Sequence, residues 1–540
     1  MHKNVRGAGD RAILIECASW REALRVTREL LGHPLGGQEE VIQGEASVLV
    51  VFADPRSARA ARSALRERTT AELAAEPVRE VRVDVVYDGP DLDDAGELTG
   101  LGRDGVARVH AETTWIVAFA GFAPGFAYLI APHEQLRVAR RTEPRTRVPA
   151  GSVALGGTYS AVYPRESPGG WHLIGRSPTV MWDVASDPPA TLQPGDQVRF
   201  TPVRDAVALV SSSPDTSDAL GAPDTAPASP ALLIERPGFH ATIQDSGRRG
   251  FGHLGVGRSG ALDARSLAEA NRLVGNPAGA AGIEIAPGGF ECRAVGDLVI
   301  AVTGASAPLT IGEPCSGDDQ RPAPFRTPFL LRDGARLSFG APRAGFRSYL
   351  AVRGGVAVAP VLGSRSTDTL SSLGPPPLRR GVTIPVGAEE TVEVWYPDGS
   401  AAQPAETGPA VLPVVLGPRD DLFSPAAAER LFGSTWAVAT AADRVGLRLS
   451  GSAGPLPVQA AGELPSEGMA TGSIQVPPSG NPIIFLNDHP VTGGYPVIGV
   501  VGTDALRLAA QLAPGDQIVF ERAGTADTAD AGRACEVASA

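Results

Sequence analysis

Two short motifs near the C-terminal end combine residue types that could act on a small polar substrate. Asp443 and Arg444 are followed by Arg448, so one carboxylate and two guanidiniums lie close together in the chain. Arginine binds carboxylate or phosphate oxygens through two parallel hydrogen bonds, which suits an anion site. Asp488 and His489 are adjacent, and such a pair can serve as general base and orienting carboxylate. These five residues are the predicted catalytic group.

Each motif also has a structural interpretation. The charged triplet can equally be an ion pair at the rim of a β-barrel. Neighbours on a strand point to opposite faces, so Asp488 and His489 need not share a pocket. If the triplet lines a polar site, Arg444→Ala should remove activity with little loss of stability. A structural ion pair predicts a lower melting temperature instead.

Turn residues supply the candidates for substrate binding. Glycine lets the backbone approach a ligand closely, and a carboxylate or amide at a turn could bind a lactam or urea. The same polar residues can simply be solvated, and an aromatic residue after a glycine pair can fill a barrel core. The predicted substrate-binding residues are Arg147, Gly151, Ser152, Gly169, Gly170, Trp171, Arg176, Glu467, Gln475, Gly493, Gly494 and Tyr495.

Many of these turns belong to an internal repeat, which lies within residues 149–200 and again within 472–520. Each copy holds a small-residue turn, a Gly-Gly-aromatic run, an Ile-Gly pair and a Pro-Gly-Asp turn that enters an alternating strand. Pro-Gly-Asp sequences form turns because each residue favours the backbone angles that a turn requires. Four features in the same order predict a duplicated all-β domain.

The elements that would position these residues are mostly short strands. Residues 11–87 follow the order β-α-β-β-α-β, which predicts a ferredoxin-like layer whose last strand covers Val81–Tyr87. Asp54-Pro55 is typical of a helix N-terminus. Short strands between glycine and proline turns over Thr114–Pro202 predict a barrel or sandwich. Ser211–Pro230 has neither basic nor aromatic residues and predicts a flexible linker.

The amino-acid composition argues against several kinds of partner and site. A formal net charge of −12 argues against nucleic acid or an anionic membrane as the partner. The four cysteines are scattered, which indicates free thiols in a reducing compartment, and the polar start of the chain predicts no signal peptide, so a cytoplasmic location is expected. Histidine and cysteine spacing predicts no metal site.

Lysine is nearly absent from the sequence. Lys3 is the single lysine, and almost all positive charge is arginine. The sequence therefore lacks a Walker-type Gly-Lys-Ser/Thr loop, a further lysine for a Schiff base and a Met-Lys-Met-like site for covalent biotin. Chemistry that needs those groups is expected to come from another chain.

Longer motifs resemble a known family. The first half resembles subunit 1 of the so-called allophanate hydrolase family, which includes an inhibitor of a sporulation sensor kinase as well as the 5-oxoprolinase B subunit. The second half resembles subunit 2, which is the 5-oxoprolinase C subunit. The motifs of the first half are Gly121–Leu129, Pro144–Val153 and Ser167–Arg176; those of the second half are Gln244–Arg248, Ser259–Asp263, Asn271–Asn276, Gly363–Asp368, Asp443–Arg448, Gly472–Pro477 and Thr492–Pro496.

The resemblance implies three cyclophilin-like barrels, one in the first half and two in the second. The predicted fold class is therefore mainly β with an α/β N-terminal layer. The predicted domains are 1–88 (ferredoxin-like), 89–205 (a barrel like the 5-oxoprolinase B subunit), 231–396 and 411–523 (barrels like the C subunit), with linkers at 206–230 and 397–410 and a disordered tail at 524–540.

The resemblance also implies a function. The chain is expected to be the fused B–C component of an ATP-dependent 5-oxoprolinase, a lactam hydrolase that opens 5-oxoproline to L-glutamate. A separate homologue of the 5-oxoprolinase A subunit would be its partner, ATP would act through the complex, and the chain alone would be inactive. One alternative is the carboxyltransferase component of a biotin-dependent urea carboxylase, and another is a sensor-kinase regulator. A homo-oligomer is compatible with the sequence.

Overall fold

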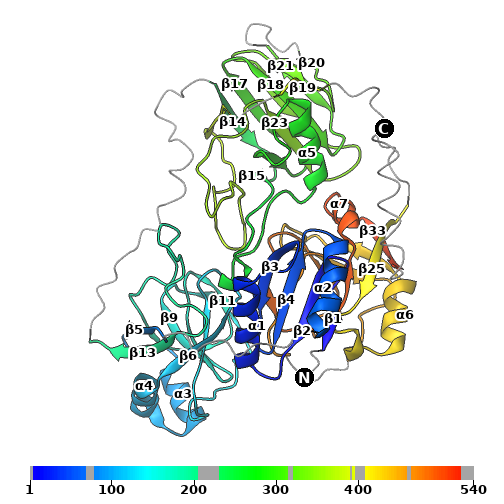
Figure 1. Cartoon of the computed structure of the whole chain (residues 1–540). Helices are drawn as coiled ribbons and strands as arrows, with labels where there is room; N and C mark the ends of the chain where they lie inside the picture. Colours follow the sequence, from blue (N-terminus) through cyan, green and yellow to red (C-terminus); the bar gives the residue numbers. More distant parts are fainter. Residues whose placement is uncertain are drawn as a thin grey trace.

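The computed structural model describes residues 4–67, 78–204, 230–313, 320–388, 392–395, 408–458 and 464–523. They form an N-terminal α/β layer, a first barrel, a two-sheet part and a last barrel (Figure 1). Most of the predicted linkers 206–230 and 397–410, and the predicted tail 524–540, lie outside these residues. The described helices are all too short or too polar to cross a lipid bilayer.

The N-terminal layer is a four-stranded antiparallel sheet in the order β1-β2-β4-β3. One face packs on the two helices, through a core that includes Ile15 and Val26. The other face, with Leu14 and Leu49, packs against Val491 of the last barrel. Because both faces are buried, the two central strands β2 and β4 are nearly continuous apolar runs. The elements are β1 (Val5–Gly7), β2 (Ala12–Glu16), α1 (Trp20–Gly32), β3 (Gln38–Gln43), β4 (Ser47–Phe52) and α2 (Pro55–Glu67).

The helix start predicted at Asp54-Pro55 is confirmed. The Asp54 carboxylate accepts hydrogen bonds from the backbone N–H groups of Arg56 at 2.8 Å and Ser57 at 2.9 Å. Such a cap satisfies donors that the first turn of a helix cannot use internally.

The strand expected over Val81–Tyr87 was assigned to the wrong sheet. It forms as β5 (Glu80–Val85), but it pairs in parallel with β13 (Gln197–Pro202) of the first barrel. Val83 and Val85 are buried in the barrel core, which explains the alternating pattern without placing the strand in the layer. The edge position in the layer is taken by β1 instead.

The two barrels have the same strand order. The first sheet runs β12-β9-β10-β7-β6-β13-β5, and a bridge between Val86 and Arg176 joins its two ends. The last barrel closes in the order β25-β32-β29-β30-β27-β26-β33. Each strand of the first barrel therefore has a counterpart numbered twenty higher, and the separate ribbons β8–β11 and β28–β31 correspond as well. The predicted duplication is confirmed.

The bounds of these elements follow the glycine and proline turns closely. The first barrel contains β5, α3 (Leu92–Thr99), α4 (Gly102–Glu112), β6 (Trp115–Ala120), β7 (Ala127–Ile130), β8 (Arg145–Val148), β9 (Ser152–Gly156), β10 (Tyr159–Val162), β11 (Ser167–Gly169), β12 (His172–Arg176) and β13. The last barrel contains β25 (Ala410–Leu416), α6 (Pro425–Gly433), β26 (Thr435–Val438), β27 (Gly446–Gly451), β28 (Glu467–Gly468), β29 (Ser473–Gln475), β30 (Ile483–Phe485), β31 (Thr492–Gly493), β32 (Val497–Val501), α7 (Leu506–Ala509) and β33 (Gln517–Arg522).

The small-residue turn of the repeat has a physical cause. Gly151 and Gly472 adopt φ values of 77° and 89°, a conformation that side chains other than glycine rarely reach. A Cβ atom on Gly151 would lie 2.5 Å from the carbonyl oxygen of Ser177, and one on Gly472 would lie 2.9 Å from that of Val501. Each glycine therefore allows two backbone segments to meet at the same point of its barrel.

The region expected to form the middle barrel, 231–396, folds as two sheets around one core, which we call the two-sheet part. Its sheets run β20-β19-β22-β17-β14-β24 and β15-β16-β23-β18-β21, and both contribute to one apolar core. This part lies above the other three in Figure 1. Its elements are β14 (Ala231–Pro237), β15 (Ala241–Gln244), α5 (Ala264–Leu273), β16 (Gly282–Ile285), β17 (Phe290–Val295), β18 (Leu298–Gly304), β19 (Leu309–Gly312), β20 (Gln320–Pro322), β21 (Phe329–Leu331), β22 (Arg336–Phe339), β23 (Ser348–Val352) and β24 (Thr383–Pro385).

Candidate functional site

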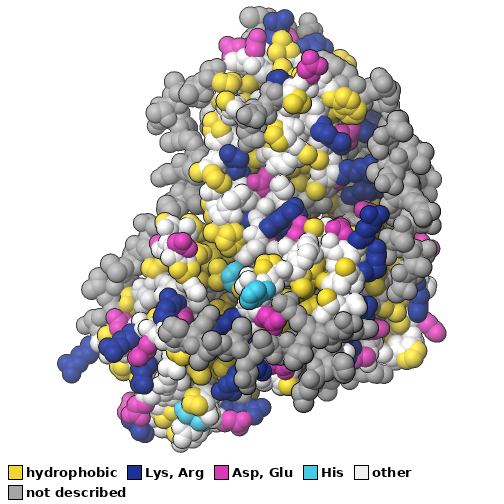
Figure 2. Space-filling model, in the orientation of Figure 1, with side chains coloured by type: hydrophobic (Ala, Val, Ile, Leu, Met, Phe, Trp, Pro, Cys, Tyr) yellow, Lys and Arg dark blue, Asp and Glu magenta, His cyan; other side chains and the backbone are white. Residues whose placement is uncertain are grey.

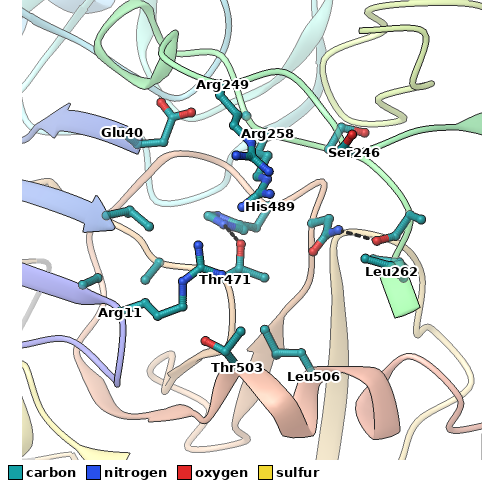
Figure 3. Close-up of a pocket in the computed structure, with 18 of the residues that line it drawn as sticks. Arg11, Glu40, Ser246, Arg249, Arg258, Leu262, Thr471, His489, Thr503 and Leu506 are labelled. Atoms are coloured by element: carbon teal, nitrogen blue, oxygen red, sulfur yellow. Dashed lines mark hydrogen bonds between the residues drawn. The ribbon is translucent and has the colours of Figure 1, made fainter. Parts of the chain in front are cut away.

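A cleft of about 970 Å³ lies where three parts of the molecule meet. The N-terminal layer contributes Arg11 and Glu40, the loop after β15 contributes Arg249 and Arg258, and the last barrel contributes His489 (Figure 3). Further polar lining residues are Asp10, Asp245, Ser246, Ser259, Arg265, Thr471, Asn487, Thr503, Asp504 and Arg507. Both halves of the chain are needed to form this cleft.

Glu40 holds the loop from the second half in place. Its carboxylate accepts hydrogen bonds from the backbone N–H groups of Gly250 at 2.6 Å and Gly252 at 3.0 Å. Burial raises the pKa of Glu40 to about 7, although the two N–H groups and the nearby Arg258 act in the opposite direction. The carboxyl group is therefore partly protonated at neutral pH.

Three guanidiniums of the cleft converge on the carboxylate of Glu39, which precedes Glu40 in the chain. Glu39 forms ion pairs with Arg249 at 2.7 Å, Arg11 at 3.0 Å and Arg258 at 3.3 Å. We call Arg11, Arg249 and Arg258 the arginine cluster. Two of its members come from the second half and one from the first, so the cluster also joins the halves.

His489 presents a neutral imidazole to the cleft. Its Nδ1 lies 2.8 Å from the carbonyl oxygen of Pro490. A carbonyl only accepts, so Nδ1 carries the hydrogen and Nε2 keeps its lone pair. The hydroxyl of Thr471 lies 3.3 Å from Nε2, which is a long and weak hydrogen bond. Burial lowers the pKa of His489, so the ring is neutral at pH 7 and can accept a proton at Nε2.

Arg444 and Asp488 lie behind the cleft wall in a buried ionic network. Arg444 Nε and Nη2 donate to the two oxygens of Asp488 at 2.9 and 3.0 Å, and Nη1 pairs with Glu284 of the two-sheet part. Asp488 also accepts from the hydroxyl of Ser259 at 2.8 Å and the backbone N–H of Thr369 at 2.9 Å. The network ties the last barrel to the two-sheet part.

This pairing sets the charge states of the two groups. Burial opposes both charged forms, but the charge of Asp488 and Glu284 holds the pKa of Arg444 above its ordinary range. In the same way, the Arg444 guanidinium holds the pKa of Asp488 below its ordinary range despite burial. Both side chains are therefore ionised and saturated with partners.

The structure does not bring Asp443 and Arg448 into this network. Asp443 is exposed, and its carboxylate accepts from the backbone N–H groups of Val445 at 2.8 Å and Gly446 at 3.0 Å, which stabilises the turn into β27. Arg448 is exposed on β27 itself. The cluster expected from the spacing does not form, because a turn and a strand direct the three side chains differently.

The predicted substrate-binding residues are spread over both barrels. Trp171 is buried in the aromatic core of the first barrel. Arg147 pairs with Glu166 at 2.6 Å, and Arg176 pairs with Asp88 at 2.8 Å.

In the last barrel, Glu467 pairs with Arg419, and Gln475 donates to the backbone carbonyl of Tyr495 at 3.2 Å. The remaining predicted positions are strand-end and turn residues of the two barrels: Gly151, Ser152, Gly169, Gly170, Gly493 and Gly494. Among the described residues that line the cleft, His489 is the one that the sequence had predicted.

Sequence reasoning missed the arginine cluster and Glu40. The loop that bears Arg249 and Arg258 lies between the motifs Gln244–Arg248 and Ser259–Asp263. This position between two family motifs could have indicated that the two arginines belong to the site. Arg11 and Glu40 gave no such signal, because each is an ordinary charged residue beside the apolar part of a strand and belongs to no recognised motif. Across the described ranges, His, Cys, Asp and Glu side chains form no group of three or more that could hold a metal ion.

The duplicated barrels and the shared cleft define a class of protein. Comparison with known sequences identifies that class. Residues 3–192 match the carboxyltransferase domain, subdomain C and D, and residues 254–522 match the carboxyltransferase domain, subdomain A and B. The chain belongs to the carboxyltransferase domain family, with the C and D subdomains first. More particularly, it is a fused protein whose two halves are similar to the B and C subunits of 5-oxoprolinase.

The relatives cover each half almost completely. The chain is 38% identical over 210 residues to the 5-oxoprolinase B subunit of Escherichia coli O157:H7, covering 37% of the chain and 95% of that protein. It is 35% identical over 295 residues to the 5-oxoprolinase C subunit of Escherichia coli K12, covering 54% of the chain and 90% of that protein.

Two further relatives extend the comparison. The match to urea amidolyase of Saccharomyces cerevisiae is 33% identical over 316 residues and covers 54% of the chain but 16% of that protein. The crystal structure of TTHA0988 superposes with a TM-score of 0.80 at 33% identity, covering 95% of the chain and 99% of that structure.

Proposed function

We propose that this chain is the fused B–C component of an ATP-dependent 5-oxoprolinase, which opens 5-oxoproline to L-glutamate together with a separate homologue of the A subunit. The observation that carries the proposal is that each half matches a nearly complete 5-oxoprolinase subunit, while the two halves also contribute side chains to one cleft. A site that needs both halves gives a physical reason for two subunits to act as one.

The cleft has groups that suit this reaction. 5-Oxoproline carries a carboxylate and a lactam carbonyl, and guanidiniums pair well with carboxylate oxygens. Ring opening adds the oxygen of water to the lactam carbon, breaks the C–N bond and leaves a proton on the nitrogen. A neutral imidazole such as His489 can take the proton from water at Nε2. ATP hydrolysis in the complex would supply the driving force.

Reconstitution tests the proposal. The purified chain alone should show negligible 5-oxoproline-dependent ATP hydrolysis, and activity should appear when an A-subunit homologue is added. The control is the A-subunit homologue alone with 5-oxoproline and ATP. Full activity of the chain by itself, or no 5-oxoproline-dependent turnover with any added A-subunit homologue, would contradict the proposal.

A second candidate function is the carboxyltransferase step of a biotin-dependent urea carboxylase. The match to yeast urea amidolyase favours it, as does the superposition on Kluyveromyces lactis urea amidolyase with a TM-score of 0.50 at 26% identity. This superposition covers 58% of the chain and 20% of that structure. Transfer of the carboxyl group from carboxybiotin to urea by this chain, without any response to 5-oxoproline, would establish this function instead.

A further inference from the structure

The arginine cluster has more positive charge than its one shared carboxylate can balance. Three guanidiniums pair with Glu39, whose side chain is 10% exposed. The nearby Glu40 is committed to the backbone N–H groups of Gly250 and Gly252. Burial is the main cause that lowers the pKa of Arg258, and the like charge of the crowded neighbour Arg249 lowers it further. An added anion would relieve this crowding.

Within the part of the chain that the structure describes, the cluster also keeps hydrogen-bond donors without a partner. A guanidinium carries five N–H donors. Arg249 and Arg258 each use Nη1 on Glu39, and Arg11 uses Nε on the carbonyl of Phe52 and Nη2 on Glu39. All three arginines line the same cavity. In Figure 3, Arg249 and Arg258 extend from the loop toward His489, and Arg11 reaches the same space from the N-terminal layer.

Two of the other carboxylates that line the cleft, Asp10 and Asp245, are already bound to neutral groups. Asp10 accepts from the hydroxyl of Thr503 at 2.8 Å, and Asp245 accepts from the hydroxyls of Ser364 at 2.7 Å and Ser366 at 2.5 Å. They do not pair with the arginine cluster. The three guanidiniums therefore outnumber the one carboxylate that pairs with them, and the excess positive charge is available to an anionic ligand.

We propose that the arginine cluster is an oxyanion-binding subsite, which holds a carboxylate or phosphoryl group of the ligand in the cleft beside His489. The identity of the ligand as 5-oxoproline or a transferring phosphate rests on the proposed function. The subsite itself does not, because it follows from charge and geometry. Its location on both halves means that neither half binds the anion with full affinity alone.

Calorimetric titration of the full chain tests the subsite. The probes are inorganic phosphate, 5-oxoproline and pyrrolidin-2-one, the lactam without the carboxylate. Arg249→Gln and Arg258→Gln should each weaken the binding of at least one anionic probe by on the order of tenfold, with no effect on pyrrolidin-2-one, because each removes a charge-assisted hydrogen bond. The anion that responds identifies whether a carboxylate or a phosphoryl group occupies the subsite.

A matched control and an opposite variant sharpen the test. Arg321 is 54% exposed and pairs with Glu313 at 3.2 Å, much as Arg249 is 49% exposed and pairs with Glu39 at 2.7 Å. Arg321→Gln should leave anion binding unchanged. Glu39→Gln removes the internal carboxylate that competes for the arginines, so it should tighten anion binding several-fold. A merely structural cluster predicts no tightening.

Two results would overturn the subsite: neither anion binds the unaltered chain, or Arg249→Gln and Arg258→Gln bind both anions as well as it does. These results are separable from failure of the proposed function. If the complex with the A-subunit homologue is inactive but the arginine variants still lose anion binding, the subsite stands and the function falls. If the complex is active and the variants change neither binding nor KM, the subsite falls alone.

Discussion

Arg444 shows how burial decides between a catalytic and a structural role. Its guanidinium is 3% exposed and pairs with both Asp488 and Glu284. Removing one partner from a buried ionic network leaves the other charges unpaired, which costs about 3–5 kcal/mol. Arg444→Ala should therefore lower the melting temperature markedly, whereas Arg448→Ala, at an exposed strand position, should change it little.

Thermal unfolding of both variants, together with turnover in the reconstituted complex, separates the two roles. A normal melting temperature for Arg444→Ala with turnover reduced a hundredfold or more would return Arg444 to the catalytic group.

Glu40 should make stability depend on pH. Burial raises its pKa from 4.5 to about 7 in the folded protein, so between these values the folded chain keeps a proton that the unfolded chain releases. This contribution is complete below pH 4.5 and is lost as the pH rises through 7, with a magnitude on the order of 3 kcal/mol. Glu40→Gln does not titrate, so its melting temperature should fall less between pH 5 and pH 8.

Differential scanning calorimetry at several pH values gives this comparison. The exposed residue Glu97 provides the control, because Glu97→Gln should keep the slope of the unaltered chain. Identical profiles for Glu40→Gln and the unaltered chain would show that Glu40 does not titrate in this range.

At the scale of single elements, the repeat was predictable because its turns need particular residues. In both Pro-Gly-Asp turns, the aspartate accepts a hydrogen bond from a backbone N–H three residues earlier, at 2.7 Å for Asp196 and for Asp516. The two glycines have φ values of 99° and 93°. These turns depend on particular residue types at fixed positions, so they could be recognised from the sequence without any knowledge of the fold.

Long-range pairing was not predictable in the same way. The alternation of Val81–Tyr87 fits any half-buried strand, and nothing local says that β13 rather than β2 is its neighbour. Arg11 and Glu40 became part of the candidate site only because the N-terminal layer packs on the second half. Spacing in the sequence can group residues within one turn, and for Asp443 and Arg448 even that grouping was wrong.

The turn between β3 and β4 should be sensitive to a single methyl group. Gly44 packs against the second half, where a Cβ atom would lie 2.3 Å from the carbonyl oxygen of Ser466. Gly44→Ala should cost about 1–3 kcal/mol, because a backbone segment must move to make room. Gly36→Ala is the matched control, since a Cβ atom there meets nothing within 4 Å. Equal melting temperatures for the two variants would contradict this packing.

At the scale of the whole molecule, the two halves share a broad and varied contact. Glu39 and Glu40 hold the arginine-bearing loop, Asp10 binds Thr503, and Arg6 pairs with Asp421 at 2.9 Å. Apolar residues of the N-terminal layer pack on the last barrel at the same time. On the face drawn in Figure 2, arginine side chains gather along the junction beneath the upper part.

The halves should therefore stay together when the chain is cut. A protease site inserted within 211–229 should allow complete cleavage, and the fragments should then co-elute in gel filtration at micromolar concentration. High salt should weaken the association only in part, because apolar contacts are not screened. Carrying Gly44→Ala in the cleaved protein should promote separation. Two separate peaks from the unaltered cleaved protein would refute this prediction.

The cleft also has a consequence for how the protein is made. Its lining runs from Ala8 near the N-terminus to Arg507 in α7. A ribosome delivers these residues in order, so the first barrel can fold long before the last wall of the cleft has been synthesised. A chain released early would contain well-formed domains and no complete binding site. Ligand binding in the cleft would thus report that translation has reached the last barrel.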